Sequence, residues 1–213
     1  MLLALMDRRS RPAGELARLA GISPSTASAH LQRLTDGGLI QVCVSGRNRY
    51  YSLAGPEVAR AVEALQALAP GQQVTSLRAA RTGTNLAFAR TCYDHLAGEL
   101  AIALANSLVT RGVIAPLRSG SIGTLRKPHD EVLAFLGVST ADAPGRRPAL
   151  RGCLDWTQRV PHVAGALGAK VLSGMTSQGW LALMSGSRAV RLTDAGRQAL
   201  TESALFPSDL LVA

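Results

Sequence analysis

A short turn between two helices constrains this 213-residue chain more strongly than any other feature. Apolar residues at spacings of three and four predict a helix over 13–20. Gly21 ends that helix, because glycine readily adopts the left-handed conformation that follows a helix. Ser23 is placed to cap the next helix, and Pro24 occupies its first position, where the missing N–H costs nothing. The sequence therefore predicts two helices joined by a three-residue turn.

The segment after this turn predicts a second helix and then a β-hairpin. Ala27 and Leu31 lie on one face of the helix and turn its polar residues outward. Two paired strands are predicted next, from the apolar alternation over 40–44, a glycine-containing turn and the run 49–53. Helix, short turn, helix and hairpin in this order predict a winged helix-turn-helix over residues 1–55.

The outward side chains of the second helix and of the hairpin tip have the chemistry of a DNA-binding surface. Small hydroxyl residues near a helix N-terminus let the helix enter the major groove, and arginines at the hairpin tip can reach a phosphate or the minor groove. The predicted DNA-binding residues are Ser23, Ser25, Thr26, Ser28, Ala29, Gln32, Arg33, Arg47 and Arg49. The chain holds 23 Lys and Arg against 14 Asp and Glu, a formal net charge of +9, which favours a polyanionic partner.

A third helix is predicted at the start of residues 56–80, which we assign to a dimerisation helix and linker. Its apolar residues recur at heptad-like spacing, and we expect them to form the seam of a two-fold homodimer, because DNA-binding winged helices usually need a second copy. Packing within the chain is the alternative. The predicted seam residues are Val58, Val62, Leu65 and Ala69.

Residues 14–53 closely resemble the ArsR/SmtB family of bacterial transcriptional repressors. The most specific part is the run ISPSTASAHL at 22–31, followed by Gly-Leu-Ile and Gly-Arg ahead of two tyrosines. The resemblance implies a homodimeric repressor of a double-stranded DNA operator, with the recognition helix over 24–35 and the wing over 39–53. The metal sites common in that family are not expected here, because 15–20 lacks cysteine and 57–68 lacks histidine and aspartate.

Beyond residue 80 the sequence repeats itself. The run 95–100 matches 162–167, and Cys-Tyr-Asp at 92–94 echoes Cys-Leu-Asp at 153–155 with six extra residues in the second copy. We expect Asp94 and Asp155 to cap the helices that follow them.

Two repeats, at about 92–140 and 153–205, are predicted to form a C-terminal domain over 81–213, each as helix, short wing and helix. The predicted fold class is mainly α with small β-hairpins (α+β): an N-terminal winged helix-turn-helix followed by two winged-helix-like helical repeats. The repeats resemble the extended C-terminal region of some ArsR-type regulators.

The repeated cysteines and histidines supply two thiols and two imidazoles. The candidate effector-binding residues are Cys92, His95, Cys153, Trp156 and His162. Three interpretations stay open: buried structural residues, a small-molecule pocket between the repeats, or a metal or thiol-redox site. Cys-x2-His and Cys-x8-His are not a recognised zinc spacing, so no cofactor is assigned and the metal remains unknown.

Catalytic motifs are missing from the sequence. No G-x-S-x-G, G-x-x-x-x-G-K-[ST] or G-x-G-x-x-G stretch occurs. Cys92, Asp94 and His95 lie too close together in sequence to form a nucleophile, its base and an orienting acid. No catalytic residue is therefore assigned, and an enzyme with its active site between the repeats is the alternative from a different class.

Cellular location follows from two features. The longest charge-free apolar run, 100–110, is far shorter than the roughly 20 residues needed to cross a bilayer. Three cysteines do not suggest a disulfide framework and favour a reducing cytoplasm. The sequence thus predicts a cytoplasmic DNA-binding repressor with no membrane partner, released from its operator by a small-molecule or metal effector that acts on the C-terminal domain.

Overall fold

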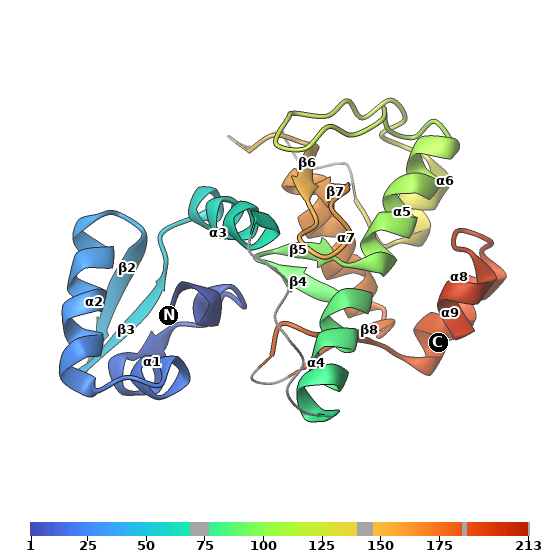
Figure 1. The fold of residues 1–213 in the computed structure, drawn as a ribbon. Coiled ribbons are helices and arrows are strands. Elements are labelled where there is room, and N and C mark those ends of the chain that lie inside the picture. Colours follow the sequence, from blue (N-terminus) through green and yellow to red (C-terminus); the bar gives the residue numbers. More distant parts are fainter. Residues whose placement is uncertain (69–76, 140–146, 185–186, 213) are drawn as a thin grey trace. The chain divides into compact units, whose positions relative to one another are not determined.

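The computed structural model describes residues 1–68, 77–139, 147–184 and 187–212 (Figure 1). The chain divides into two compact units, Met1–Leu65 and Gln66–Ala213. Two sequence predictions, Ala69 in the dimer seam and the end of the first repeat at 140, lie outside the described residues.

The first unit begins with short elements and two helices that meet at the predicted turn. Its elements are η1 (Leu2–Leu5), β1 (Arg11–Pro12), α1 (Ala13–Ala20), α2 (Pro24–Asp36), β2 (Ile40–Ser45), β3 (Asn48–Leu53) and the greater part of α3 (Pro56–Leu68). Gly21 follows α1 with a φ of 65° in the left-handed region. Ser23 Oγ accepts the backbone N–H of Thr26 at 3.2 Å, and Pro24 opens α2. Both predicted helix signals are thus confirmed.

The hairpin predicted after α2 is present and carries a third strand. β2 and β3 pair antiparallel from Ile40 opposite Leu53 to Ser45 opposite Asn48. β1 pairs with the other edge of β3, which gives the strand order β1-β3-β2. Leu16 and Leu31 are fully buried between these elements. The helices and the sheet therefore share one core, and the polar side of α2 stays outside it.

The second unit is built from short hairpins and helices. Its elements are α4 (Leu77–Phe88), β4 (Arg90–Cys92), β5 (His95–Ala97), α5 (Glu99–Thr110), α6 (Glu131–Phe135), β6 (Arg151–Leu154), β7 (Pro161–Ala164), α7 (Gly165–Ser177), β8 (Leu181–Leu183), β9 (Val190–Leu192), α8 (Asp194–Glu202) and α9 (Ser208–Val212). Two hairpin–helix segments, β4–β5–α5 and β6–β7–α7, correspond to the two halves of the sequence repeat.

The register of these hairpins aligns the two halves. Ala97 pairs with Arg90 in the first hairpin, and Ala164 pairs with Arg151 in the second. The six extra residues of the second half therefore lie between Cys153 and His162, where its hairpin has one more strand pair and a longer turn.

The parts after α5 and α7 differ. In the second half, β8 and β9 pair as a short antiparallel hairpin, and α8 begins at Asp194 as predicted. The first half departs from the expectation: within its described residues, 115–130 holds no named strand, and α6 spans only Glu131–Phe135. Isolated bridges such as Ile122 with Arg151 join this stretch to β6.

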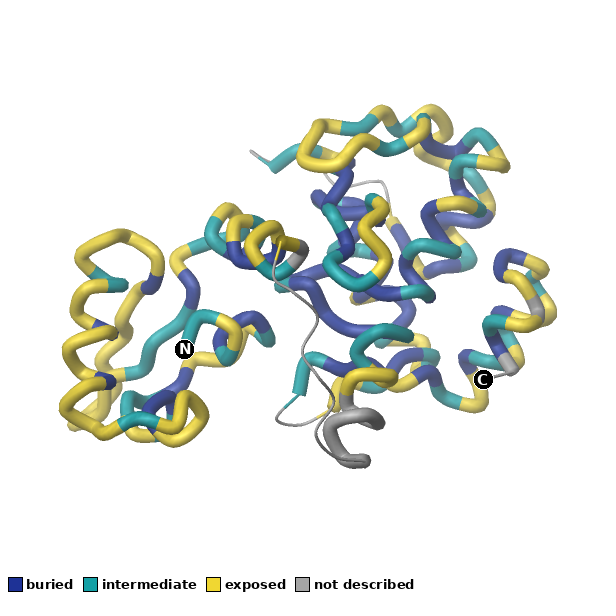
Figure 2. The backbone as a smooth tube through the Cα atoms, in the orientation of Figure 1, coloured by how far each residue is buried: buried dark blue, intermediate teal, exposed yellow. Residues whose placement is uncertain are grey.

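The core of the second unit lies between α5 and α7 (Figure 2). Leu100, Leu104 and Leu108 recur along α5 and are each no more than 2% exposed. Val171 and Met175 of α7 are buried in the same cluster. Because β5 packs on α7 and β7 packs on α5, each hairpin is held against the helix of the other half.

Gly165, the first residue of α7, is a position where a side chain is expected to destabilise the second unit. Its φ is 82°, and an added Cβ would lie 2.7 Å from the carbonyl oxygen of Pro148. We expect Gly165→Ala to lower the free energy of unfolding by about 1–3 kcal/mol, measured by urea denaturation followed through tryptophan fluorescence. Gly83→Ala in α4 is the control, because its added Cβ would meet nothing within 4 Å. Equal unfolding midpoints for the two variants would contradict this explanation.

Candidate functional site

All nine predicted DNA-binding residues are exposed, and the opposite side of α2 is buried through Ala27 and Leu31. Four of the nine also come together in space. Ser28 and Gln32 of α2 line one groove of about 440 Å³ with Arg47 and Arg49 of the hairpin. The fold thus places polar helix positions and two guanidinium groups around one concave surface.

Several hydroxyl groups at the start of α2 already have partners. Ser23 Oγ lies 2.8 Å from Thr26 Oγ1 and 2.9 Å from Ser25 Oγ, besides capping the helix. Ser28 Oγ donates to the Pro24 carbonyl at 2.9 Å. These hydroxyls stabilise the start of α2. A ligand could bond to them only by sharing or replacing these hydrogen bonds.

The side chains of Gln32 and Arg33, also on α2, have different surroundings. Gln32 Nε2 donates to Asp36 Oδ1 at 2.7 Å along the outer face of the helix. Arg33 lines a separate groove with His30 and the first residues of the chain. Arg33 therefore does not belong to the groove that holds Ser28, Gln32, Arg47 and Arg49.

The predicted dimer seam on α3 is unevenly exposed. Val62 is 6% exposed and Val58 is half-buried, whereas Leu65 is 66% exposed. The chain itself covers Val62, so Leu65 is the described seam residue that offers the largest apolar surface to a second copy.

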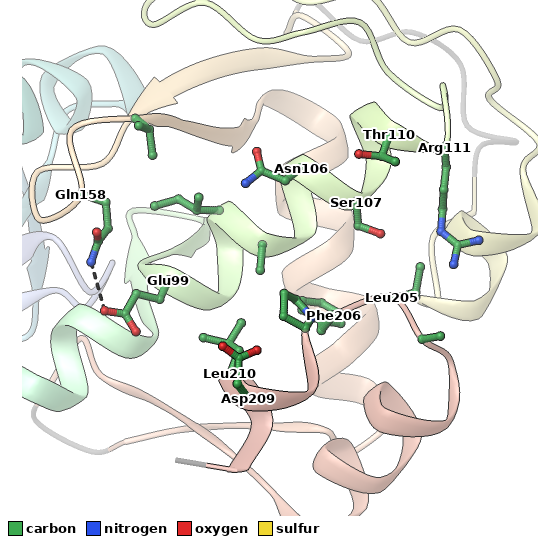
Figure 3. Close-up of a pocket in the computed structure, with 15 residues that line it drawn as sticks. Glu99, Asn106, Ser107, Thr110, Arg111, Gln158, Leu205, Phe206, Asp209 and Leu210 are labelled. Carbon is green, nitrogen blue, oxygen red and sulfur yellow. Dashed lines mark hydrogen bonds between the residues drawn. The ribbon is translucent and has the colours of Figure 1, made fainter.

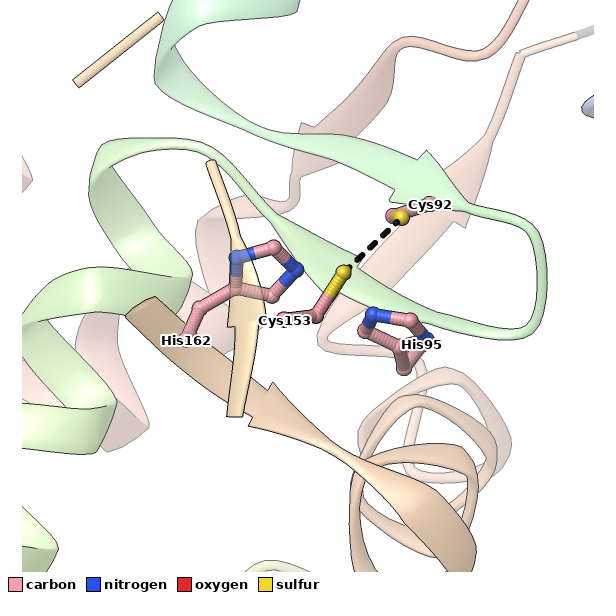
Figure 4. A group of neighbouring side chains, drawn as sticks. All are labelled: Cys92, His95, Cys153 and His162. Carbon is pink, nitrogen blue, oxygen red and sulfur yellow. Dashed lines mark hydrogen bonds between the residues drawn. The ribbon is translucent and has the colours of Figure 1, made fainter. Parts of the chain in front are cut away.

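Four of the five candidate effector residues converge in the second unit (Figure 4). One potential metal-ligating atom from each of Cys92, His95, Cys153 and His162 lies within 4.8 Å of the other three. All four side chains are buried, and the two Sγ atoms are 3.8 Å apart. We call these four residues the Cys–His cluster.

The Cys–His cluster arises from equivalent positions of the two hairpins. Cys92 is the cross-strand partner of His95, and Cys153 is the cross-strand partner of His162. Cys92 and His95 are the last pair before the turn of the first hairpin, and one further pair, Leu154 with Pro161, follows Cys153 and His162 in the second. The length of the turn therefore does not change which residues face each other. The two imidazole rings stack with centroids 5.1 Å apart and an angle of 29° between their planes.

Each imidazole lies beside a buried aspartate. His95 Nδ1 is 3.1 Å from Asp94 Oδ1, and His162 Nδ1 is 3.9 Å from Asp155 Oδ2. Arg147 forms a two-pronged ion pair with Asp94, with Nη2 at 3.0 Å from Oδ1. Arg90 Nη2 is 2.9 Å from Asp155 Oδ2, with both side chains fully buried.

These contacts set the charge states around the Cys–His cluster. Burial alone would raise the pKa of Asp155, but Arg90, Thr157 and the Gly98 N–H lower that pKa to about 2. Burial likewise opposes ionisation of Asp94, yet its bonds to His95 and Arg147 hold its pKa well below the usual range. Both carboxylates are therefore charged inside the unit.

The pKa values of His95 and Cys153 shift in opposite directions. Burial lowers the pKa of His95, but its hydrogen bond to Asp94 and the proximity of Cys153 outweigh burial and raise it. The neighbouring Cys92 thiol and the two imidazoles lower the pKa of Cys153 against the effect of burial. The cluster therefore favours a thiolate at Cys153.

The expectation that Asp94 and Asp155 cap the following helices is wrong. Gly98 is the N-cap residue of α5 and Ala164 is that of α7, and neither provides a side-chain cap. Asp155 Oδ2 instead accepts the backbone N–H of Gly98, in the other half of the repeat, at 2.7 Å. The aspartates join distant segments of the chain.

Sequence reasoning missed the two arginines that pair with these aspartates. Arg90 and Arg147 lie 65 and 53 residues from their partners, so no local pattern marks them. Trp156, the fifth candidate effector residue, is outside the Cys–His cluster. The Arg90 guanidinium carbon lies 4.8 Å from the centroid of its ring. The sequence signal that did mark this region was the repetition of Cys and Asp in both halves.

A larger groove of about 990 Å³ runs along the outer side of α5 (Figure 3). Ile102, Phe206 and Leu210 give it apolar walls, while Asn106 and Arg111 contribute polar groups. None of the five candidate effector residues lines this groove. The mixed lining is typical of a small-molecule site.

Across the described part of the chain, no helix combines the length and the apolar character that crossing a membrane requires.

Comparisons with known proteins agree with the first unit and extend over the second. The profile of a family described as "Helix-turn-helix domain" matches residues 1–43. The "Uncharacterized HTH-type transcriptional regulator YdfF" of Bacillus subtilis (strain 168) is 43% identical over 200 residues, which cover 92% of this chain and 87% of the relative. The "HTH-type transcriptional regulator Rv0324" of Mycobacterium tuberculosis is 37% identical over 68 residues, which cover 32% of this chain and 30% of the relative.

Proposed function

This chain belongs to the family of HTH-type transcriptional regulators, and we propose that it is a homodimeric, cytoplasmic repressor that binds a DNA operator through a winged helix and is released by an effector acting on its second unit. The observation that carries DNA binding is the shared groove of Ser28, Gln32, Arg47 and Arg49. The resemblance of residues 14–53 to ArsR/SmtB repressors supports the repressor assignment.

In this proposal α2 enters the major groove and the β2–β3 hairpin is the wing. The exposed side of α2 carries small and polar side chains, which allow close approach to base edges. Arg47 and Arg49 stand at the hairpin tip beside that helix, where guanidinium groups bind phosphates on the flank of the site. Gln32 is the candidate for base recognition, because glutamine pairs with adenine through two hydrogen bonds.

In this proposal a second copy of the chain would cover Leu65, an exposed apolar residue of α3. We expect Leu65→Glu to shift the protein from dimer to monomer in light scattering after gel filtration, since a buried carboxylate in an apolar seam is strongly unfavourable. Its exposure of 66% means that the substitution does not disturb the core of the single chain. Leu183→Glu, which changes an exposed leucine of β8 in the second unit, is the matched control. A Leu65→Glu protein that stays dimeric would place the interface elsewhere.

The second unit supplies the effector site in this proposal. The groove along α5 has room for a small organic molecule and offers both apolar walls and the polar groups of Asn106 and Arg111. Because α5 packs against β5 and β7 on its other side, a molecule in the groove would act on the same helix that supports the hairpins. Regulation then means a difference in operator affinity between the bound and free states of this unit.

Fluorescence anisotropy tests the DNA-binding function directly. The purified chain is titrated into a labelled duplex from its own upstream region and into a scrambled duplex of equal length, at near-physiological salt. We expect binding to the upstream duplex to be tighter by about 10³-fold or more. Equal, weak and strongly salt-dependent binding to both duplexes, with no specific footprint elsewhere on the genome, would contradict a sequence-specific regulator.

A further inference from the structure

We infer that the Cys–His cluster is a closed tetrahedral site for a soft divalent metal ion of the zinc class, shared equally by the two hairpins of the second unit. Cys92, His95, Cys153 and His162 supply two thiol sulfurs and two imidazole nitrogens, a donor set that selects zinc over magnesium or calcium. The assignment does not depend on DNA binding, because it concerns the second unit alone.

The spacing of the donor atoms fits such an ion. A tetrahedral zinc with Zn–S bonds of about 2.3 Å holds its two sulfurs about 3.8 Å apart. The Sγ atoms of Cys92 and Cys153 are 3.8 Å apart, and all four donor atoms lie within 4.8 Å of one another. Small side-chain rotations therefore complete the coordination without movement of the strands.

The unused nitrogens of the two imidazoles are the second, independent observation. His95 Nε2 and both ring nitrogens of His162 are buried and have no hydrogen-bond partner among the described residues. Asp94 already occupies His95 Nδ1, so Nε2 is the nitrogen that remains for a ligand. A carboxylate on the far nitrogen of a histidine is the usual support of a metal ligand in proteins.

The arrangement favours a metal ion over a disulfide between the same two sulfurs. A disulfide requires the sulfurs to approach to about 2.05 Å, well inside the observed 3.8 Å. It would also leave the buried nitrogens of His95 and His162 without partners. One tetrahedral ion satisfies both sulfurs and both rings at once, and two thiolates neutralise its charge.

A metal ion bound at the Cys–His cluster would link the two halves of the second unit. All four ligands are buried, so the ion would have no position open to a substrate, which is the pattern of a structural site. Cys92 and His95 belong to one hairpin, and Cys153 and His162 belong to the other. The bound ion would join β4–β5 to β6–β7 across the centre of the repeat.

Cobalt titration of the reduced, chelator-treated full chain, without DNA, tests the site. We expect one Co²⁺ per chain, with the intense visible bands of tetrahedral cobalt and a thiolate-to-cobalt charge-transfer band, both removed when Zn²⁺ is added. Cys153→Ser should lose most of the charge-transfer band, and His162→Ala should weaken the visible bands. Each should reduce zinc affinity by more than the roughly 10–100-fold caused by loss of an outer-shell partner.

Matched controls come from the same chain. Cys43→Ser and His129→Ala remove an exposed cysteine and an exposed histidine, and both should bind cobalt as the wild type does. Circular dichroism checks that every variant is folded, and the wild-type titration decides the matter even if a variant is not. A wild-type chain without a tetrahedral cobalt spectrum overturns the assignment. Mild oxidation that links Cys92 to Cys153 in a chain that binds no metal would replace it with a thiol-redox site.

Discussion

Replacing Asp155 by alanine is expected to lower the free energy of unfolding of the second unit by about 3–5 kcal/mol. The substitution leaves the guanidinium of Arg90 buried without its carboxylate, and both side chains are fully buried in the structure. It also removes the acceptor of the Gly98 N–H at 2.7 Å and of the Thr157 hydroxyl at 2.6 Å. Urea denaturation in the presence of a chelator measures the loss apart from any bound metal.

The readout and the controls separate this explanation from general destabilisation. Both tryptophans of the chain, Trp156 and Trp180, lie in the second unit, so tryptophan fluorescence follows that unit. Glu202→Ala removes an exposed hydrogen bond from Gln198 within the same unit and should change stability by less than about 1 kcal/mol. The double variant Arg90→Met/Asp155→Leu should recover part of the loss, because it leaves no buried charge unpaired. An Asp155→Ala protein as stable as the wild type would contradict the assigned role of the pair.

The second large effect is expected for the double variant Arg47→Ala/Arg49→Ala. If each arginine neutralises one phosphate, the pair contributes about 3 kcal/mol, and its loss should weaken DNA binding by about 100-fold. The slope of log affinity against log salt concentration should fall by about two. The loss should be similar on the upstream and the scrambled duplex, since phosphates carry no sequence information.

Two comparison variants make this result specific. Arg126→Ala/Arg191→Ala removes the same charge from exposed positions of the second unit and should leave the salt slope nearly unchanged. Gln32→Ala should instead reduce the difference in binding free energy between the upstream and the scrambled duplex by about 1–3 kcal/mol. The slope of log affinity against log salt concentration should not change. An arginine pair whose loss changes neither affinity nor slope would show that the β2–β3 hairpin is not the wing.

The N-terminal elements could be predicted because their signals are local. Ser23 caps α2 through a residue three positions away, and Gly21 ends α1 through its own backbone angle. The hairpin could be predicted from its glycine-containing turn in the same way, and its register pairs the two buried residues Ile40 and Leu53. β1 was not predicted, because a two-residue strand has no period to detect.

The Cys–His cluster could be only partly predicted. The sequence supplied the four donors, but spacings of two and eight residues do not match a metal motif that lies on one turn or helix. In the structure the donors meet as cross-strand pairs of two hairpins, Cys92 with His95 and Cys153 with His162. Sequence spacing does not reveal this convergence, because a hairpin fixes its partners by register and leaves the loop length free.

The aspartates were misassigned for the opposite reason, because a local interpretation was available and tertiary contacts overrode it. Asp94 and Asp155 both precede helices in the sequence, and a capping role was expected of them on that ground. Their observed partners include Arg147 and Arg90, which no local pattern connects to them. Buried charges of this kind are placed by the whole fold, and their partners appear only once the distant segments have packed.

The division of the Cys–His cluster into two equal shares has a bearing on its origin. One hairpin–helix segment holds a cysteine and a histidine, which is half of a tetrahedral set. A chain with a single segment could complete that set only by pairing with a copy of itself. Gene duplication and fusion would convert such an intermolecular site into an intramolecular one, after which each half could diverge everywhere except at the donors. The longer turn of the second hairpin would be divergence of that kind, since it lengthens the loop while the cross-strand pair stays in place.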